Sequence, residues 1–258
     1  MYSPCDISDF PPAAYLVYCV FETRSDSHPA TPVGVDGLPV HVVEDNGLSA
    51  AVSRVPGRTR EMWTDVPRVM AYEKVVETFH RDRAVLPMRY GCVMADGAQV
   101  VELLHKHREE YQSALTELEG CVEMGVRIIA QVEKRETRKE SPSDMSTHSG
   151  GRAYLTARKG HYAEVDRPLQ REAAMAQRCC SAFDGLFARC KTEYCSAPNA
   201  VFLVPTLSLF FLVKREREDA FRRAFRMLSR GESERMLLSG PWPPYNFVPS
   251  DQPGEQLP

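Results

Sequence analysis

The chain has 258 residues, of which 43% are hydrophobic and 26% are charged, and its formal net charge is -3. This length corresponds to one large domain or two of ordinary size, and the apolar content is sufficient for a proper core. The near-neutral charge and the lack of a long Lys/Arg tract argue against general binding to nucleic acid or anionic membranes. No apolar run approaches the roughly 20 residues that a membrane-spanning helix needs.

The start of the chain does not have the pattern of a secretory signal. It carries Asp6 and Asp9, and it lacks a basic start followed by an apolar stretch. The eight cysteines are scattered along the chain. Without an export signal, we expect a reducing cytoplasm in which the cysteines remain free thiols.

The first elements in chain order are predicted to be strands. Tyr15–Phe21 is a continuous apolar run, consistent with a strand buried on both faces. Val40–Val43 and Leu48–Val55 lie on either side of an Asn-Gly pair, and this pair is a hairpin signal because both residues tolerate positive φ. Before the hairpin, Asp36 and Gly37 have the character of turn residues, not of a catalytic acid site.

A helix that leads into a central strand is expected next. Apolar side chains recur on one helical face at steps of three and four, at Val69, Tyr72, Val76 and Phe79. Thr64 or Asp65 can cap the N-terminus, and Pro87 ends helical structure. The sequence LPMRYG at 86–91 then predicts a core strand, in which Arg89 would be buried. A structural ion pair with a carboxylate is our first interpretation of Arg89, and a binding role is the second.

A second helix completes the N-terminal half. Asp96 is predicted to cap it, with Gln99 in a capping box, and Gly120 to end it. Its apolar face keeps one register from Val100 to Leu118. The elements so far predict an α+β domain of order βββαβα over residues 1–121.

Residues 122–240 predict a second α+β domain of order βαββαβ, which is the ferredoxin-like order. Val126–Val132 alternates as a strand does, and the charged, then Ser/Pro/Gly-rich residues 133–151 predict a mobile connector. From Tyr162 to residue 194, apolar positions recur at steps of three and four, which predicts one long amphipathic helix. The remaining elements are predicted at Asn199–Val204, Leu207–Val213, Glu216–Leu228 and Arg235–Ser239.

The last segment, residues 241–258, is predicted to be an extended tail. Its closely spaced prolines exclude a helix and a central strand. Three rigid aromatic residues lie among them: Trp242, Tyr245 and Phe247. Such a segment gains stability by docking, either on its own domain or on a partner, since aromatic side chains dominate interface energies.

No set of residues predicts catalysis, a cofactor or a metal. Four cysteines lie close together in the sequence: Cys179, Cys180, Cys190 and Cys195. Their spacing does not match paired zinc ligands, so we expect them to pack in the core. His80, His105 and His107 are expected to be surface or partly packed residues. Phosphate-binding, dinucleotide, zinc-protease and nucleophile-elbow motifs are all lacking.

Seven segments, taken in order, carry a resemblance to a known family. They are Tyr15–Phe21, GVDGLPV at 34–40, GLSAAVSRVP at 47–56, the stretch from Glu73 through VLPMRYG into the helix of His107, MGVRI at 124–128, RAYLTARK at 152–159 and GPWPPYNF at 240–247. The chain resembles the GvpF/GvpL family of gas vesicle proteins over nearly its whole length. GPWPPYNF after VLPMRYG at this separation is the most specific feature.

The resemblance implies two α+β domains, both modified ferredoxin-like, and no catalysis. It implies an accessory or minor structural protein for assembly of the gas vesicle, a protein-walled organelle of the prokaryotic cytoplasm. The implied partners are the hydrophobic shell protein and other gas vesicle proteins, without cofactor, nucleic acid or membrane. Trp242, Tyr245, Phe247 and Arg89 are the candidate contact residues, and the long helix after Tyr162 is a further candidate surface.

Two other classes of function stay open. A ferredoxin-like regulatory module that binds a small ligand predicts a convergent polar pocket, and the sequence shows no such cluster. A thiol or metal enzyme that uses the cysteine-rich segment predicts a reactive thiol.

Overall fold

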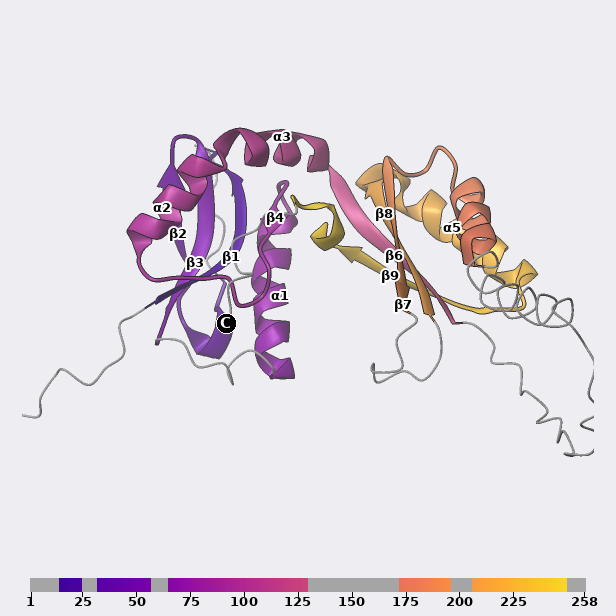
Figure 1. Ribbon diagram of the computed structural model, residues 1–258, viewed down its shortest axis with the longest axis horizontal. Helices are drawn as coiled ribbons and strands as arrows, with labels where there is room; N and C mark the ends of the chain where they lie inside the picture. Colours follow the sequence, from indigo (N-terminus) through magenta and orange to yellow (C-terminus); the bar gives the residue numbers. More distant parts are fainter. Residues whose placement is uncertain (1–13, 25–31, 57–64, 130–171, 196–205, 250–258) are drawn as a thin grey trace, which may run out of the picture. The chain divides into compact units, whose positions relative to one another are not determined.

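The computed structural model describes residues 14–24, 32–56, 65–129, 172–195 and 206–249 (Figure 1). The chain divides into two compact units, Met1–Glu123 with Gly240–Pro258, and Met124–Ser239. Each unit combines helices with an antiparallel sheet, so the fold class is α+β as predicted. The expected connector, the expected strand Asn199–Val204 and the start of the expected long helix lie outside the described residues.

The first sheet is built around strand β1 (Ala14–Glu22), as the apolar run predicted. Its order is β2-β3-β1-β4, with β2 at His41–Asp45, β3 at Leu48–Val55 and β4 at Leu86–Pro87; β5 (Val93–Met94) also pairs with β1. The β2–β3 hairpin is confirmed. Its turn residues Asn46 and Gly47 have φ of 45° and 87°, the region that such a turn requires.

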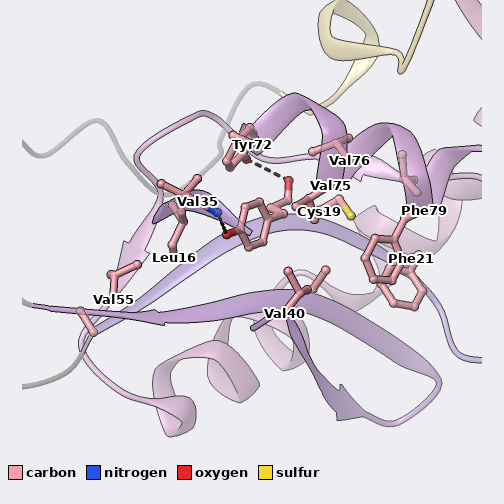
Figure 2. Packing of buried hydrophobic residues seen from close by; sticks show 14 residues of the cluster. Leu16, Cys19, Phe21, Val35, Val40, Val55, Tyr72, Val75, Val76 and Phe79 are labelled. Carbon is pink, nitrogen blue, oxygen red and sulfur yellow. Dashed lines mark hydrogen bonds between the residues drawn. The ribbon is translucent and has the colours of Figure 1, made fainter. Parts of the chain in front are cut away.

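Helix α1 (Val66–His80) covers the core of the first unit. Its predicted inner face is confirmed for Tyr72, Val76 and Phe79, which are buried against β1 (Figure 2). The ring of Phe79 stacks on Phe21 at 5.0 Å between centroids. The Tyr72 hydroxyl lies 2.7 to 3.1 Å from three backbone carbonyl oxygens, those of Val17, Tyr18 and Met88, and so ties α1 to β1 and to the chain after β4.

The GVDGLPV segment is a tight turn held against β1 by hydroxyl groups. The backbone N–H of Val35 donates to the Tyr18 hydroxyl (3.0 Å), which donates to Ser53 Oγ (3.0 Å), and Ser53 donates to the carbonyl oxygen of Pro39 (2.9 Å). A Cβ at Gly34 would lie 2.4 Å from the Tyr18 hydroxyl and 2.7 Å from Ser53 Oγ. Only glycine therefore fits at this position without displacing the network.

The predicted central strand at 86–91 is wrong. The chain forms two strands of two residues, β4 and β5, with a turn between them, and β4 lies at an edge of the sheet. Pro87 lacks the N–H that a central strand needs, and Gly91 has φ of 90°, which ends the extended conformation. Arg89 lies in this turn and is exposed, so the prediction of a buried Arg89 is also wrong.

The second predicted helix is two helices, α2 (Gly97–Lys106) and α3 (Arg108–Leu118). The N-cap is confirmed, because Asp96 Oδ1 accepts from the backbone N–H of Gln99 (2.9 Å). The reciprocal bond of the predicted capping box lies one residue earlier, because Gln99 Oε1 accepts from the N–H of Ala95 (3.0 Å), the residue before the N-cap. The helix breaks at His107, whose φ of -103° and ψ of 18° are not helical. The apolar positions keep their register across this break, so the sequence periodicity did not reveal it.

The second sheet has the order β7-β8-β6-β9. Its strands are β6 (Cys121–Ile129), β7 (Arg189–Cys195), β8 (Thr206–Lys214) and β9 (Arg235–Trp242), and α5 (Glu218–Gly231) follows β8 through a short 3-10 turn, η4 (Arg215–Arg217). Three aromatic rings join α5, β8 and the segment after helix 172–182. Phe183 lies 4.4 Å from Phe221 and 5.2 Å from Phe211 between centroids.

The long helix predicted to continue to residue 194 is wrong in its C-terminal part. The helix ends at residue 182, Gly185 follows with φ of 70°, and β7 begins at Arg189. Cys190 therefore lies on a strand and not on a helix. The spacing of three and four residues between apolar positions continued by coincidence, because apolar residues on one face of a strand can also lie four positions apart.

The last strand is longer than predicted. β9 continues past Ser239 through Pro241 to Trp242. Because β9 is the edge strand beside β6, a proline without an N–H donor is tolerated there. A short 3-10 turn, η5 (Tyr245–Phe247), follows.

Candidate partner-binding site

Residues 242–247, from the end of β9 through η5, form a segment that packs within the first unit. Phe247 is buried, and Tyr245 packs against the core cluster beneath α1. The carboxylate of Glu123, only 4% exposed, accepts from the backbone N–H of Asn246 (2.8 Å) and from its side-chain Nδ2 (2.7 Å). Two hydrogen bonds to one buried carboxylate fix the path of the chain at this point.

A groove of about 380 Å³ lies between this segment and α1. Its lining residues are Met70, Ala71, Glu73, Lys74 and Glu77 of α1, with Trp242, Pro243 and Tyr245. Two large apolar side chains in it are open to solvent, Met70 at 59% and Trp242 at 47%. Exposed large apolar side chains gathered in one groove are typical of a surface that receives another polypeptide.

The groove carries more negative than positive charge. Glu73, Glu77 and Lys74 give it an excess of one negative charge. The phenol of Tyr245 is neutral, because burial and then the nearby charge of Glu73 raise its pKa. The groove therefore combines exposed apolar side chains with an excess of negative charge, which suits an apolar segment that carries a basic residue.

The structure places the four predicted contact residues differently. Trp242 and Tyr245 lie together in the groove, whereas Phe247 is buried and supports the segment from within. Arg89 is exposed in the turn between β4 and β5 and does not line the groove. Met70, which the sequence did not single out, joins Trp242. The sequence did contain a signal for Met70, because it is an apolar residue that lies outside the buried apolar stripe of α1.

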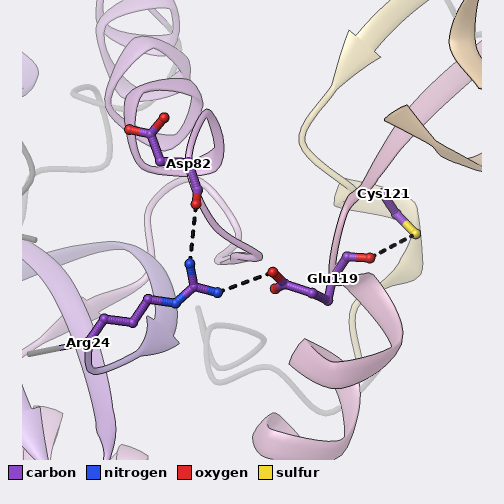
Figure 3. Close-up of polar contacts among 4 residues, drawn as sticks. All are labelled: Arg24, Asp82, Glu119 and Cys121. Atoms are coloured by element: carbon purple, nitrogen blue, oxygen red, sulfur yellow. Dashed lines mark hydrogen bonds and ion pairs between the residues drawn. The ribbon is translucent and has the colours of Figure 1, made fainter. Parts of the chain in front are cut away.

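A second, polar pocket of about 330 Å³ was not anticipated. Its ionisable lining residues are Glu22, Arg24, Arg83 and Glu119. The Arg24 guanidinium donates to Glu119 Oε1 (3.1 Å) and to the carbonyl oxygen of Asp82 (3.4 Å). The Cys121 thiol donates to the backbone carbonyl oxygen of Glu119 (3.7 Å; Figure 3). These residues come from distant parts of the chain, so no local pattern could have predicted the pocket.

The histidines differ in their environments. His105 is exposed and lies 3.7 Å from Asp45 Oδ2, and His107 stacks on Tyr111 at 5.3 Å. His80 is buried at 5% exposure, which is deeper than its place near the end of a helix indicated.

The thiols of Cys179 and Cys190 are poor nucleophiles, because burial raises their pKa values. Cys180 Sγ lies 3.9 Å from Cys190 Sγ, and both are half-buried. Burial, with the charge of Cys180 next, raises the pKa of Cys190 to about 12, and burial likewise raises that of Cys179 to about 12. Within the described ranges, no three His, Cys, Asp or Glu side chains are grouped to hold a metal ion. Among the same residues, no helix is long and apolar enough to cross a membrane.

Fold and surface together define an α+β protein whose most distinctive feature is a groove with exposed apolar side chains. Residues 14–249 match the family described as "Gas vesicle synthesis protein GvpL/GvpF". The chain belongs to this family, as its motifs predicted, and has a gas-vesicle-related role.

Relatives and solved structures agree with this assignment. The chain is 27% identical to gas vesicle protein F of Streptomyces sp. (strain CB03234), over 89% of this chain and 98% of that protein. It is 26% identical to gas vesicle protein L of the same strain, over 90% and 91%. The crystal structure of gas vesicle protein GvpF from Anabaena sp. PCC7120 shares the fold, with a TM-score of 0.71 at 19% identity over 91% of this chain and 95% of that one.

Proposed function

We propose that this protein is an accessory or minor structural protein of gas vesicle assembly. In this role it binds the hydrophobic shell protein and other gas vesicle proteins, in the cytoplasm and at the gas vesicle, without catalysis. Family membership supports the connection to gas vesicles. The observation that carries the binding part is the groove beside α1, where Trp242 and Met70 are exposed.

The proposed mechanism follows from the chemistry of a shell-forming protein. Subunits that bury apolar faces only after assembly are prone to aggregate before it. A binder that covers part of such a face holds the subunit until it is added to the wall. Trp242 supplies a large rigid surface, and the flexible side chain of Met70 adapts to the partner's shape. Glu73 and Glu77 would pair with a basic residue at the edge of the bound segment.

We further infer two modified ferredoxin-like domains, residues 1–121 and 122–240, each forming most of one unit, with residues 241–258 as a tail that belongs to the first compact unit. Among the described residues of the second unit, the elements β6, helix 172–182, β7, β8, α5 and β9 come in the order βαββαβ, and the strand order β7-β8-β6-β9 supports the inference. The first unit departs from this order because three strands precede its first helix, and further by its short strands β4 and β5 and its broken second helix.

Capture of the shell protein tests the proposal. The tagged full chain is co-expressed with the shell protein, and the captured amount is compared for wild type and for Trp242→Ala combined with Met70→Ala. Both side chains are exposed, so the fold is expected to survive. Tyr245 is left intact because it packs on the core. Loss of a tryptophan anchor of about 2 kcal/mol weakens binding roughly 30-fold.

Tyr194→Ala is the matched control, because Tyr194 is an aromatic residue of similar exposure, 46%, on β7. Reduced capture by the groove variant alone supports the proposal. If wild type, the groove variant and the Tyr194→Ala control captured equal amounts of shell protein, the groove would not be its binding site.

A second candidate is a regulatory module that binds a small ligand, and the polar pocket is the observation that favours it. Two arginines and two glutamates face this pocket, which suits a zwitterionic ligand such as an amino acid. A thermal-shift screen with the 20 amino acids tests this candidate. A shift that Arg24→Gln abolishes would support it, and a flat response for the wild type would reject it.

A further inference from the structure

The second unit carries a strongly basic helix face. Residues 214–230 contain seven Lys/Arg and three Asp/Glu, although the whole chain has a formal net charge of -3. In α5, one stripe of side chains recurs at steps of three and four: Arg223, Arg226, Met227 and Arg230. All four are exposed, Met227 at 75%. Phe221 and Phe225 lie on the opposite face and are buried, so this arginine stripe points away from the core.

Helix stability explains only part of this arrangement. A basic residue in the last turn interacts favourably with the helix dipole, which accounts for Arg230. Arg222 pairs locally with Glu218, at 2.8 Å. Arg223 and Arg226 lie in the middle of α5, beyond the reach of the dipole. Asp219, four residues before Arg223, favours the helix, but Arg226 has a like charge three residues before it and another four residues after it, and this spacing destabilises a helix.

We propose that the arginine stripe of α5 docks an acidic segment of a protein partner. Each guanidinium can hold a carboxylate through two parallel hydrogen bonds. From Arg223 to Arg230 the stripe spans about 10 Å, which is two turns of a helix. A partner helix with carboxylates at steps of three and four can therefore lie along it, with Met227 as an apolar contact. Asp219, exposed one turn before Arg223, would meet a basic residue and set the orientation.

A nucleic acid fits this surface less well than an acidic polypeptide does. Its phosphates repeat without interruption, and they would meet Asp219 and the acidic side chains of Glu216 and Glu218 at the same end of the helix. A net negative chain also repels a long polyanion. Met227, at the edge of the stripe, has no role against a phosphate backbone.

The stripe and the groove lie on different units and can be tested separately. The groove selects an apolar segment with a basic residue, and the stripe selects an acidic one. The chain could therefore hold two chemically different partners, or two parts of one partner, at once. Failure of the stripe would leave the groove proposal intact.

Fluorescence anisotropy with the full chain tests the stripe. The probe is a labelled, alanine-rich helical peptide with glutamates at steps of three and four, and a second peptide has lysine in their place. The test variant combines Arg223→Glu, Arg226→Glu and Arg230→Glu. The control variant combines Arg81→Glu, Lys106→Glu and Arg108→Glu, which are exposed on the first unit and change the net charge equally.

At about 50 mM salt, we expect the test variant to bind the glutamate peptide about tenfold more weakly than wild type, and the control to differ less than about twofold. The test variant should gain binding to the lysine peptide. Equal weakening of both variants, or no binding by wild type, would overturn the proposal. The proposal would also be overturned if labelled single-stranded DNA bound wild type more tightly than the glutamate peptide does and the three substitutions in the stripe weakened that binding. Thermal melting of each variant confirms that it is folded.

Discussion

The contact between Glu123 and Asn246 is expected to hold the Trp242 segment against the first unit. Glu123→Ala removes two hydrogen bonds to a carboxylate, of 2.8 and 2.7 Å. Bonds to charged groups contribute about 1.5 to 3 kcal/mol each, and Asn246 is only half-buried, so its donors can turn to water. We therefore take the lower value for each bond and expect a loss of about 3 kcal/mol. Glu123→Gln keeps one acceptor and should lose about half of this.

Hydrogen exchange of the segment measures this loss directly. Residues 240–249 contain four prolines, so the reporting amides are few, and Asn246 and Phe247 are the most useful among them. A loss of about 3 kcal/mol in local opening speeds their exchange roughly 100-fold for Glu123→Ala. Global unfolding by urea should change less than the local opening if the segment opens on its own.

Glu119→Ala is the control for this experiment. Its side chain is 56% exposed and pairs with Arg24, away from the segment. It should leave the exchange of residues 240–249 unchanged. If Glu123→Ala also left that exchange unchanged, the carboxylate would not anchor the segment, and the groove would owe its shape to the packing of Tyr245 and Phe247 alone.

Three further predictions concern the core and the thiols. Tyr72→Phe removes the buried hydroxyl that bonds backbone carbonyls and should lower the free energy of unfolding by about 1 to 2 kcal/mol in urea titrations; an unchanged midpoint would mean that the bond is not made. Gly34→Ala places a methyl group 2.4 Å from a hydroxyl and should destabilise by about 1 to 3 kcal/mol, whereas Gly231→Ala, with open space around it in α5, should be neutral or slightly stabilising in the same melts. Cys179 and Cys190, with pKa values of about 12, should react slowly with iodoacetamide at pH 8 and faster as the pH rises, which mass spectrometry can follow; rapid labelling of either at pH 8 would revive the thiol-enzyme interpretation.

Local elements were predictable where one short stretch of sequence contains the whole physical cause. The Asn46-Gly47 turn needs two residues that accept positive φ, and both are present. The cap that Asp96 forms on the N–H of Gln99 closes within four residues. The inner face of α1 follows from the spacing of Tyr72 and Phe79, because a helix that covers a core must bury one stripe.

Predictions failed where a distant part of the chain decides the outcome. The residues around Arg89 read as a core strand, but β1 is flanked by β3 on one side and offers only short pairings with β4 and β5 on the other. The break at His107 and the end of the helix at residue 182 are backbone events that apolar periodicity does not record. The polar pocket joins residues near 22, 83 and 119, which no window of sequence contains.

By itself, the sequence determined the α+β class, the hairpin, the Asp96 cap of α2 and, through its ordered motifs, the GvpL/GvpF family, whereas Asp65 makes no side-chain cap bond to α1. The aromatic segment at the C-terminal end was visible too, as a stretch that had to dock. Only the tertiary structure decided which of its side chains are buried in the fold and which remain exposed to solvent. Phe247 is buried and Trp242 is exposed because the hydrogen bonds of Glu123, about 120 residues earlier in the chain, set the position of the backbone between them.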